Sequence, residues 1–345
     1  MKAVRFHEHG GPEVLRYEDA PDPELRDGDA IVRVRAVALN HLDIWNRRGI
    51  KGLTFKFPHI SGADIAGEII STADNSWSPG RRVMLQPGLS CARCEACLAG
   101  RDNDCPRYDV LGSQSDGGYA EYVRVPLPNL IAIPDAIGFV EAAAFPLTFL
   151  TAWHMLVTRA KVQPGEDVLV LGAGSGVGQA AVQIAWLHGA RVVATAGTDA
   201  KLAKARELGA YEVINHRTHD IGDEVRRLTN RRGVDVVIEH VGAATWDHSV
   251  KSLARGGRLV TCGATTGYDA KIDLRFLFTR QYSVMGSYMG TKAELSRAAQ
   301  FFFAGQLRPV VDSTFPLSRA ADAHRRLEQG EHFGKVVLEV LQQPT

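Results

Sequence analysis

The chain has 345 residues, 45% of them hydrophobic and 23% charged, and its 40 basic residues nearly balance its 39 acidic ones. This length is too great for one ordinary core and predicts two domains, while the composition excludes a disordered or fibrous chain. The balanced charge argues against nucleic acid and membrane surfaces as partners, so we expect a small-molecule substrate.

The N-terminal residues Met1 to Gly10 lack the apolar core of a signal peptide, and no stretch has eighteen consecutive apolar residues. We therefore expect a cytoplasmic protein. From Met1 to about Pro126 short strands and turns alternate, which predicts a mostly β half. Val140 to Thr158 predicts a helical connector that is interrupted at Pro146, because proline lacks a backbone donor. We place the domain junction there.

Four cysteines, Cys91, Cys94, Cys97 and Cys105, lie within a loop-like lobe at about residues 88–106. Four thiolates at this spacing suit tetrahedral zinc, and they leave no open position for water, so the predicted role is structural. An iron–sulfur cluster is an alternative that the same ligands permit, although its usual spacing differs. The fifth cysteine, Cys262, stands in an apolar run and is expected in the core.

From Asp167 to Tyr288 apolar strands alternate with helical segments, which predicts a parallel sheet covered by helices. Six strands make a full doubly wound sheet. The expected strands are Asp167–Leu171, Arg191–Ala196, Glu212–Asn215, Asp235–Glu239, Arg258–Cys262 and Ser283–Gly286. A last strand, Lys335 to Leu341, could extend this sheet or return to the first domain.

The first of these strands runs into a glycine turn and then into a helix from Gln179 to His188, the geometry that a pyrophosphate requires. The spacing departs from strict G-x-G-x-x-G, and a tight turn can use glycine for steric reasons alone. Its predicted dinucleotide contacts are Ala173, Gly174, Ser175, Gly176, Val177 and Gly178.

The second strand ends in Gly197 and Thr198, where an acidic residue would bind the ribose of NAD. Small residues there, with Lys201 and His216 nearby, could accommodate a 2′-phosphate, so we expect NADP(H) to be preferred over NAD(H). Asp199 argues against this preference, and Lys201 could simply begin a solvated helix face.

The cysteine lobe followed by the nucleotide fold resembles the medium-chain dehydrogenase/reductase superfamily, which contains zinc alcohol dehydrogenases and quinone oxidoreductases. The resemblance runs nearly end to end and includes the motifs Gly10–Leu15, Ala38–Asp43 with Arg48–Gly49, Gly117–Val123, Pro146–Thr148 with Thr151–Trp153, and Phe333–Val337. It implies an α/β protein with a GroES-like, partly open β-barrel catalytic domain at residues 1–151 and 293–345 and a Rossmann domain at 152–292. It also implies an active site between the domains and a homodimer or homotetramer.

In zinc-dependent members a cysteine, a histidine within Gly-His-Glu and a later cysteine hold the catalytic metal. This sequence has Asn40, Ala63 and Thr148 at those places. An amide, a methyl and a hydroxyl cannot replace such ligands, so no catalytic zinc is expected. The active-site half resembles quinone oxidoreductases and enoyl reductases, although that branch usually lacks the cysteine lobe.

Asn40 is the first candidate to hold a substrate carbonyl or the cofactor edge, with capping of a turn as its alternative role. His41 and Asp43, together with His59 and Asp64, are candidates for proton transfer or orientation. Thr148 and Thr151 either contact substrate or nicotinamide or bond back into their helix. The strand ends expected at the nicotinamide are Val241, Gly242, Gly263, Ala264, Gly286 and Ser287, with Tyr288 a possible donor to substrate.

The leading hypothesis is an NADPH-dependent reductase of activated double bonds in quinones, enones or enoyl thioesters, because alkene reduction needs no Lewis acid. The second is an alcohol or aldehyde dehydrogenase that recruits another group in place of zinc. The third is a nucleotide-binding structural or RNA-associated protein resembling some lens crystallins. The near-zero net charge argues against RNA.

Overall fold

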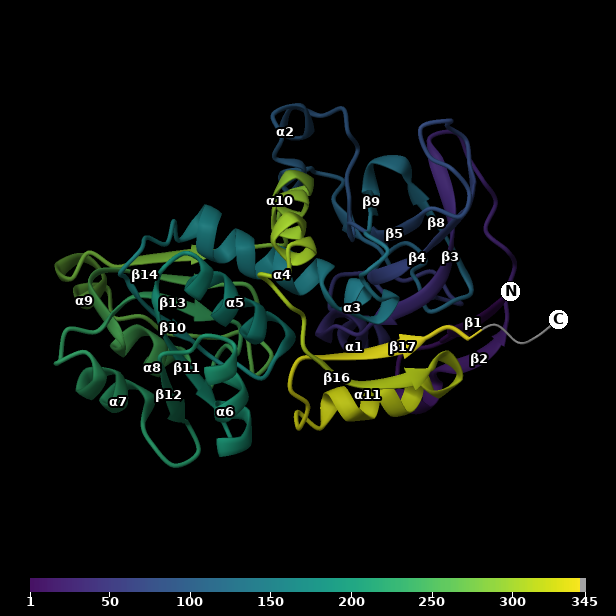
Figure 1. Ribbon diagram of the computed structural model, residues 1–345. Coiled ribbons are helices and arrows are strands. Elements are labelled where there is room, and N and C mark those ends of the chain that lie inside the picture. Colours follow the sequence, from purple (N-terminus) through teal and green to yellow (C-terminus); the bar gives the residue numbers. More distant parts are fainter. Residues whose placement is uncertain (342–345) are drawn as a thin grey trace. The chain divides into compact units, whose positions relative to one another are not determined.

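The computed structural model describes residues 1–341, which divide into two compact units (Figure 1). Unit 1 contains residues 1–147 and the segment that begins at Thr291, and unit 2 contains Thr148–Gly290. Among residues 1–341 no helix is both long enough and apolar enough to span a bilayer.

Unit 1 is built on a seven-stranded sheet with the order β16-β17-β3-β4-β5-β9, and β8 also pairs with β3 (Figure 1). The central strand β3 has alternating apolar side chains that join the buried core of this unit. The strands are β3 (Asp29–Ala38), β4 (Asp64–Thr72), β5 (Arg82–Leu85), β8 (Tyr122–Pro126), β9 (Leu130–Ala132), β16 (Val311–Pro316) and β17 (Lys335–Glu339).

Shorter elements complete unit 1. Two hairpins pair β1 (Lys2–Arg5) with β2 (Arg16–Asp19) and β6 (Gly88–Leu89) with β7 (Asp109–Val110). Its helices are α1 (His41–Arg48), α2 (Glu95–Leu98), α3 (Phe139–Ala144), α10 (Lys292–Phe303) and α11 (Ala320–Glu328).

The last strand returns to unit 1, which settles the alternative that its sequence left open. β17 pairs antiparallel with β3 and parallel with β16. It begins at Lys335 as expected and ends at Glu339. The C-terminal segment therefore completes the first domain, as the family resemblance implied.

Unit 2 contains a six-stranded parallel sheet with the order β12-β11-β10-β13-β14-β15, the predicted doubly wound arrangement. The strands are β10 (Asp167–Val170), β11 (Arg191–Ala196), β12 (Glu212–Asn215), β13 (Val234–Glu239), β14 (Leu253–Thr261) and β15 (Ser283–Gly286). β14 begins at Leu253 and not at the expected Arg258. A register shift with β13 and the glycines Gly256 and Gly257 interrupt its apolar pattern, so its first half could not be recognised in the sequence.

Helices cover both faces of this sheet (Figure 1). α5 (Gly176–Leu187) and α6 (Asp199–Glu207) contact β10, β11 and β12, while α7 (Ile221–Leu228) and α8 (Trp246–Lys251) pack against each other and against the opposite face. α9 (Leu274–Thr279) precedes the edge strand β15. The predicted break in the connector is present, because α4 (Pro146–Trp153) starts at the proline and continues as a π-helix, His154–Arg159.

Cys262 follows β14 and is half-buried. Burial raises the pKa of its thiol to about 12, so it remains a neutral thiol.

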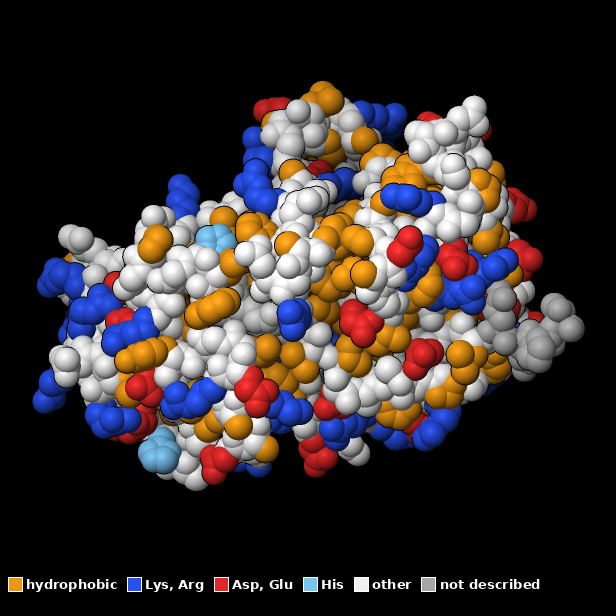
Figure 2. Space-filling model, in the orientation of Figure 1, with side chains coloured by type: hydrophobic (Ala, Val, Ile, Leu, Met, Phe, Trp, Pro, Cys, Tyr) orange, Lys and Arg blue, Asp and Glu red, His pale blue; other side chains and the backbone are white. Residues whose placement is uncertain are grey.

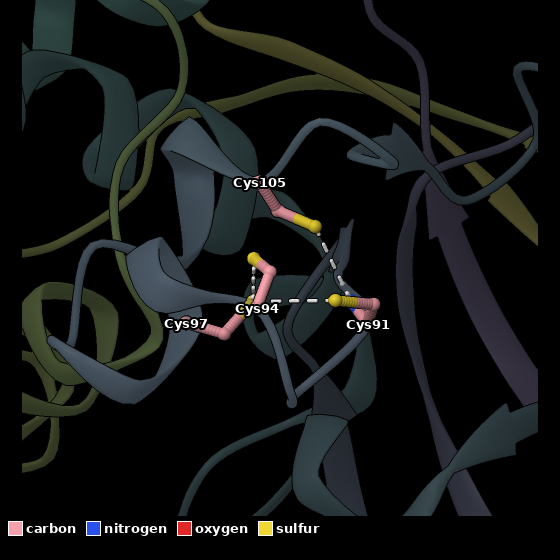
Figure 3. Close-up of side chains that lie close together, drawn as sticks. All are labelled: Cys91, Cys94, Cys97 and Cys105. Atoms are coloured by element: carbon pink, nitrogen blue, oxygen red, sulfur yellow. Dashed lines mark hydrogen bonds between the residues drawn. The ribbon is translucent and has the colours of Figure 1, made fainter.

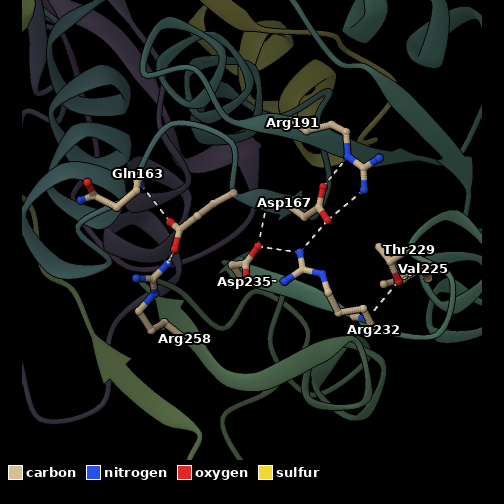
Figure 4. Close-up of polar contacts among 10 residues, drawn as sticks. Gln163, Asp167, Arg191, Val225, Thr229, Arg232, Asp235 and Arg258 are labelled. Atoms are coloured by element: carbon tan, nitrogen blue, oxygen red, sulfur yellow. Dashed lines mark hydrogen bonds and ion pairs between the residues drawn. The ribbon is translucent and has the colours of Figure 1, made fainter.

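A cluster of ion pairs lies at the amino ends of the unit 2 strands (Figure 4). The buried Asp167 accepts hydrogen bonds from Arg191 and, at 2.7 Å, from Arg232, which also pairs with Asp235. Nearby, Arg258 pairs with Glu166 at 2.6 Å. These contacts tie β10, β11, β13 and β14 together and leave the carboxyl ends of the strands for a ligand.

On the face of the molecule that Figure 2 shows, basic and acidic side chains are interspersed. This distribution agrees with the formal net charge of +1.

Candidate functional site

The four predicted cysteine ligands come together in unit 1 (Figure 3). Their sulfur atoms lie within 4.8 Å of one another, with Cys94 Sγ 3.5 Å and Cys91 Sγ 4.0 Å from Cys97 Sγ. Tetrahedral zinc with Zn–S bonds of about 2.3 Å requires sulfur separations of about 3.8 Å. The donor set therefore fits a closed zinc site.

Hydrogen-bond donors stabilise the cysteine thiolates of this lobe, and a lysine side chain binds the lobe to α10. A backbone N–H of Arg93 and the Arg107 guanidinium lower the pKa of Cys91 to about 5, which favours the thiolate that a metal requires. Lys292, at the start of α10, donates from Nζ to Gly88 O and to Asp102. The lobe is thus fastened to a helix more than 180 residues further along the chain.

In unit 2 the glycine turn joins β10 to α5 as predicted. Ser175 caps the helix, and its hydroxyl accepts a hydrogen bond from Gly178 N at 2.8 Å. The N–H groups of Gly176 and Val177, in the first turn, have no intrahelical acceptor and can bind an anion. A Cβ on Gly178 would lie 2.2 Å from Gly172 O, so this close approach requires glycine.

Two neighbouring residues hold the turn. Thr195 of β11 accepts hydrogen bonds from Gly172 N and Ala173 N through its hydroxyl and carbonyl oxygens. His240, after β13, has Nε2 2.8 Å from Leu171 O and 3.4 Å from Ser175 Oγ. Burial lowers the pKa of His240, so the imidazole is neutral and donates from Nε2.

At the end of β11, Gly197 lies beside His216 and Arg217. A Cβ on Gly197 would lie 2.9 Å from Arg217 Nε and 3.1 Å from His216 Nε2, so glycine leaves room for both side chains. Burial lowers the pKa of His216, and the charges of Arg217 and Lys201 lower it further. Arg217 and Lys201 therefore create a positive potential at the predicted 2′-phosphate position, and His216 beside them is neutral until an anion binds.

Thr198 and Asp199 have local partners in the same region. Thr198 Oγ1 caps α6 by accepting from Lys201 N at 3.4 Å, and Asp199 accepts from the side chain of Asn215 at 2.9 Å. The Asp199 carboxylate, whose presence argued against NADP(H), thus already accepts a hydrogen bond from the Asn215 side chain.

The loop after β13 is held by Glu239, whose side chain is fully buried. Its carboxylate accepts from Val241 N at 2.6 Å and Gly242 N at 3.0 Å, and also from Thr245 and Ser249. A Cβ on Gly242 would lie 2.8 Å from Ala264 Cα, so the predicted loops after β13 and β14 pack closely. Gly263 and Ala264 directly follow the end of β14 and Cys262.

Two predicted ligand-contacting hydroxyls in unit 2 lack hydrogen-bond partners among the described residues. They belong to Thr148, which is 3% exposed in α4, and to Ser287, which follows Gly286 at the end of β15. Thr148 therefore does not bond back into its helix. A buried orphan hydroxyl points to an absent partner such as a ligand. Thr151 is buried one turn later, and Tyr288 is 62% exposed.

Unit 1 holds a buried polar cluster that includes Asn40, one of the three positions without a zinc ligand, and Asp64, which directly follows Ala63, another of them. Lys335 Nζ lies 2.6 Å from Asn40 Oδ1 and 2.9 Å from Asp64 Oδ2, and Asn40 Nδ2 donates to Asp64 at 3.0 Å. All three side chains are at least nine-tenths buried. An ammonium group thus provides the cation in this cluster, and a second cation beside it is disfavoured by charge repulsion.

Asp43 and the two histidines have different surroundings. Asp43 is 1% exposed and accepts from Asn40 N at 2.7 Å and Gly62 N at 3.0 Å. Burial raises the pKa of Asp43 to about 6, although these N–H groups and Lys335 lower it. His41, the first residue of α1, is partly exposed, while the buried His59 hydrogen bonds Gly112 O.

Several residues that contact these sites were not predicted from the sequence. Arg217 follows His216 directly and Glu239 ends a predicted strand, so both had a local signal. Lys335 lies in the quoted motif Phe333–Val337, where it served only to identify the family. Tyr119, whose ring packs on Gly62, lies in the quoted motif Gly117–Val123, which likewise served only to identify the family.

Comparisons with known proteins agree with this architecture. Residues 26–135 match the model of the alcohol dehydrogenase GroES-like domain, and residues 176–304 match that of the zinc-binding dehydrogenases. Human quinone oxidoreductase is 30% identical over 98% of this chain and 97% of its own. Crotonyl-CoA reductase of Streptomyces avermitilis is 30% identical over 92% of this chain and 81% of its own.

Solved structures extend the likeness to alcohol dehydrogenases. A crystal structure of an NAD-dependent alcohol dehydrogenase has a TM-score of 0.96 and 48% identity, covering 99% of this chain and 100% of its own. The cobalt- and zinc-bound thermostable alcohol dehydrogenase from Pyrobaculum aerophilum has a TM-score of 0.90 and 33% identity, covering 99% of each chain. The predicted α/β fold, with its GroES-like and Rossmann parts, is confirmed. The chain therefore belongs to the medium-chain dehydrogenase/reductase superfamily and is an NAD(P)H-dependent oxidoreductase.

Proposed function

We propose that this oxidoreductase reduces an activated carbon–carbon double bond or a quinone without a catalytic zinc. The observation that carries the proposal is the buried contact of Lys335 with Asn40 and Asp64. The zinc-binding positions of alcohol dehydrogenases carry a metal cation that acidifies an alcohol, and an ammonium group cannot bind an alkoxide in the same way. A reduction that needs only hydrogen-bond donors and a proton agrees better with this cluster.

The bound dinucleotide would supply a hydride to the β-carbon of an enone or enoyl thioester. The substrate then carries the two electrons as an enolate, and a proton added to the α-carbon completes the reduction. Thr148 is a candidate donor to the substrate or to the nicotinamide amide, because its buried hydroxyl has no partner among the described residues. Water can supply the proton, so no dedicated acid is required.

We propose that Asn40 donates a hydrogen bond to the substrate and that its contacts with Lys335 and Asp64 strengthen this donor. Lys335 donates to its oxygen, which polarises the amide and strengthens its N–H donors. One of these donors bonds Asp64 at 3.0 Å, and the other faces Ala38 O at 3.5 Å. The second contact is long, so this N–H is the less engaged donor of the amide and the one that a substrate oxygen would bind.

We propose NADP(H) as the preferred cofactor. Arg217 and Lys201 place positive charge near Gly197, where the 2′-phosphate would lie, and the neutral His216 beside them can take up a proton when a phosphate binds. Asp199, the acidic residue that could bind a ribose hydroxyl, is already bonded to Asn215. A phosphate would offset the repulsion between the Arg217 and Lys201 charges.

We also propose a homo-oligomer that forms through unit 2. β15 is an edge strand of the six-stranded sheet, with Val284 39% exposed. Beside it in sequence, α9 exposes Leu274 and Phe278 by 65% and 68%. A second copy pairing with this edge would bury these apolar side chains and the open edge. Sedimentation at several concentrations would test this proposal.

Alcohol oxidation is the second candidate function. It is favoured by the likeness to alcohol dehydrogenase structures, including one at 48% identity. In that case Asp64 or His41 would have to accept the proton of the alcohol, since the Asn40 cluster holds a lysine cation.

A substrate panel separates the two candidates. Purified protein is mixed with NADPH or NADH and a quinone, cyclohexenone or crotonyl thioester, and in parallel with NADP⁺ or NAD⁺ and benzyl alcohol. We expect oxidation of NADPH with at least one activated double bond. Efficient alcohol oxidation with no turnover of the alkenes and quinones would refute the reductase proposal.

Two variants with matched controls locate the contacts. Thr148→Val should lower kcat/KM about tenfold by removing one hydrogen bond, whereas Thr158→Val, an exposed site further along the same helical segment, should not.

Arg217→Ala should raise the KM for NADPH at least about tenfold and leave that for NADH unchanged. Arg227→Ala, which removes an exposed arginine of α7, is its control. Equal effects on both dinucleotides would reject the 2′-phosphate assignment.

A further inference from the structure

One lysine of α10 contacts both ends of the four-cysteine lobe. Lys292 Nζ donates to Gly88 O at 3.1 Å, and Gly88 lies three residues before Cys91. The same amine lies 3.4 Å from Asp102 Oδ2, and Lys292 N donates to Asp102 Oδ1 at 3.1 Å. Asp102 lies three residues before Cys105. Lys292 therefore connects the two segments that carry the first and the last of the four thiolates.

A zinc ion held by the four thiolates would join the same two segments through its bonds to sulfur. The segments are adjacent, because Cys91 N donates to Cys105 Sγ at 3.5 Å. Lys292 and the metal thus favour one closed arrangement of the lobe. When two groups stabilise the same arrangement, each increases the other's affinity for it by the same factor. Zinc binding and the Lys292 contacts are therefore expected to be coupled.

The lobe also holds the first turn of α10. Asp102 is buried, and its carboxylate accepts the backbone N–H of the first helical residue, at the positive end of the helix dipole. Thr291 caps the helix by accepting from Glu294 N at 3.2 Å, and Glu294 accepts from Thr291 N at 2.7 Å. The start of α10 is thus fixed by its own cap and by the lobe together.

The residues before α10 come directly from the end of β15. Ser287 N donates to Thr261 O of β14 at 2.8 Å, and Arg159 Nε donates to Gly286 O at 3.0 Å. These contacts fix the chain where it leaves the sheet of unit 2. Gly286 and Ser287 are predicted nicotinamide contacts, and Ser287 Oγ has no hydrogen-bond partner among the described residues.

The segment 287–292 is therefore held at both ends, by the sheet of unit 2 and by the lobe. Met289, near its middle, is 6% exposed and has a φ of 52°, which residues other than glycine rarely adopt. Such a conformation persists only where the surrounding structure imposes it. Release of the end at Lys292 would return conformational freedom to these residues, and a ligand that orders them would then bind less tightly.

We propose that the four-cysteine lobe, with zinc bound, positions the predicted nicotinamide contacts after β15 by holding Lys292. Lys292 is a positioning residue that acts through the backbone of the segment 287–292 and does not touch the dinucleotide. Without the metal the lobe loosens, the first turn of α10 is released, and Gly286 and Ser287 must be ordered by the dinucleotide itself. The effect on the dinucleotide rests on the proposed function of unit 2, while the coupling of Lys292 to zinc does not.

The rate of zinc release to the chelator 4-(2-pyridylazo)resorcinol tests the coupling of Lys292 to the metal. Lys292→Met removes the amine and keeps a side chain of similar length, so zinc release should be about fivefold faster than in the wild type, the effect of about one hydrogen bond. Arg297→Met changes an exposed side chain of the same helix and is the matched control. Equal release rates in the two variants would overturn the proposal.

Hydrogen exchange followed by mass spectrometry locates the released residues. Exchange in the segment 287–292 should be faster in zinc-free protein, and also in Lys292→Met that still holds its zinc. Residues 298–303, later in α10, should keep their protection, because Phe302 stacks on Phe145 with ring centroids 4.5 Å apart. Unchanged exchange in 287–292 would contradict the proposal. If the zinc-free chain does not fold, the zinc-bound variant still gives the answer.

Binding titrations separate the nicotinamide end from the rest of the dinucleotide. NADPH is compared with 2′-phospho-ADP-ribose, and NADH with ADP-ribose, which lack the nicotinamide. In zinc-bound Lys292→Met the dissociation constant of the dinucleotide should rise about tenfold, the cost of ordering about one more residue, while that of its nicotinamide-free counterpart should not change. A variant that weakens both ligands equally, or neither, refutes the positioning role.

These measurements need no turnover, so they are independent of the substrate. If the protein reduces no alkene or quinone but Lys292→Met weakens only the complete dinucleotide, the proposed function fails and the positioning role stands. If the wild type binds each dinucleotide no more tightly than its nicotinamide-free counterpart, the predicted contacts after β15 are wrong and the positioning role falls with them.

Discussion

Replacing Lys335 by methionine should destabilise unit 1 strongly. The lysine is 2% exposed and its Nζ lies 2.9 Å from a fully buried Asp64 oxygen. At an effective dielectric constant of about 20, this separation corresponds to an attraction of about 6 kcal/mol. Desolvation offsets part of this in the wild type. In Lys335→Met the Asp64 carboxylate stays buried without its cation, which costs about 3–5 kcal/mol.

Thermal unfolding followed by circular dichroism measures this cost. For a unit of this size the loss corresponds to a midpoint lower by roughly 10 °C. The double variant Asp64→Asn, Lys335→Met should recover most of the loss, because the amide carries no charge and can still accept from Leu147 N. Lys51→Met, which changes an exposed lysine of the same unit, is the control and should leave the midpoint unchanged.

The reasoning would be refuted by a Lys335→Met protein that loses less than about 1 kcal/mol, or by a double variant no more stable than the single one. Either result would mean that water reaches Asp64 or that the carboxyl is uncharged in the native protein.

Three further outcomes are expected. Metal analysis should find one zinc and no iron per chain, and Cys97→Ser should lose the metal and expose the lobe to protease while unit 2 keeps its melting transition. In Glu239→Ala, Val241 N and Gly242 N lose their hydrogen-bond acceptor, which costs about 1–3 kcal/mol of stability for each buried donor. Calorimetry should therefore show weaker dinucleotide binding and a lower thermal unfolding midpoint for unit 2. A bound phosphate favours protonated His216. The affinity for NADPH relative to that for NADH should therefore fall as the pH rises through the pKa of His216 in the NADPH complex. Binding titrations at several pH values that give a constant affinity ratio would contradict this.

Much of the fold was predicted from local patterns. The six strands of unit 2 were each recognised from an apolar run bounded by turns, and three of them have the expected bounds. β10 and β13 each differ from the expected bounds by one residue, whereas β14 begins five residues earlier than expected, because the register shift with β13 and the glycines Gly256 and Gly257 interrupt its apolar run. Whether the last strand joins the sheet of unit 1 or that of unit 2 could be predicted only from the family resemblance, since Lys335–Glu339 alone fits either sheet.

The candidate sites divide in the same way. The cysteine lobe and the glycine turn each lie within one short segment, so spacing alone predicted them; Ser175 caps the helix by accepting from Gly178 N, and their contacts with a dinucleotide stay a prediction. The role of Asn40 was left between catalysis and capping, and Asp43 was a candidate for proton transfer or orientation. Both residues form the capping box of α1, and Asp43 also accepts from Gly62 N, a contact that no local pattern predicts.

The features with local signals could be predicted from the sequence: the strand pattern, the helix starts, the four thiolates and the residues Asn40, Ala63 and Thr148, which stand where the family resemblance places zinc ligands. Which buried charges meet is visible only in the folded protein. Lys335 lies 295 residues from Asn40 in the chain, and Arg47 lies 277 residues from His324. The physical reason is that a buried ion or donor is stable only beside a complementary group, and the fold, not the spacing along the chain, brings these partners together.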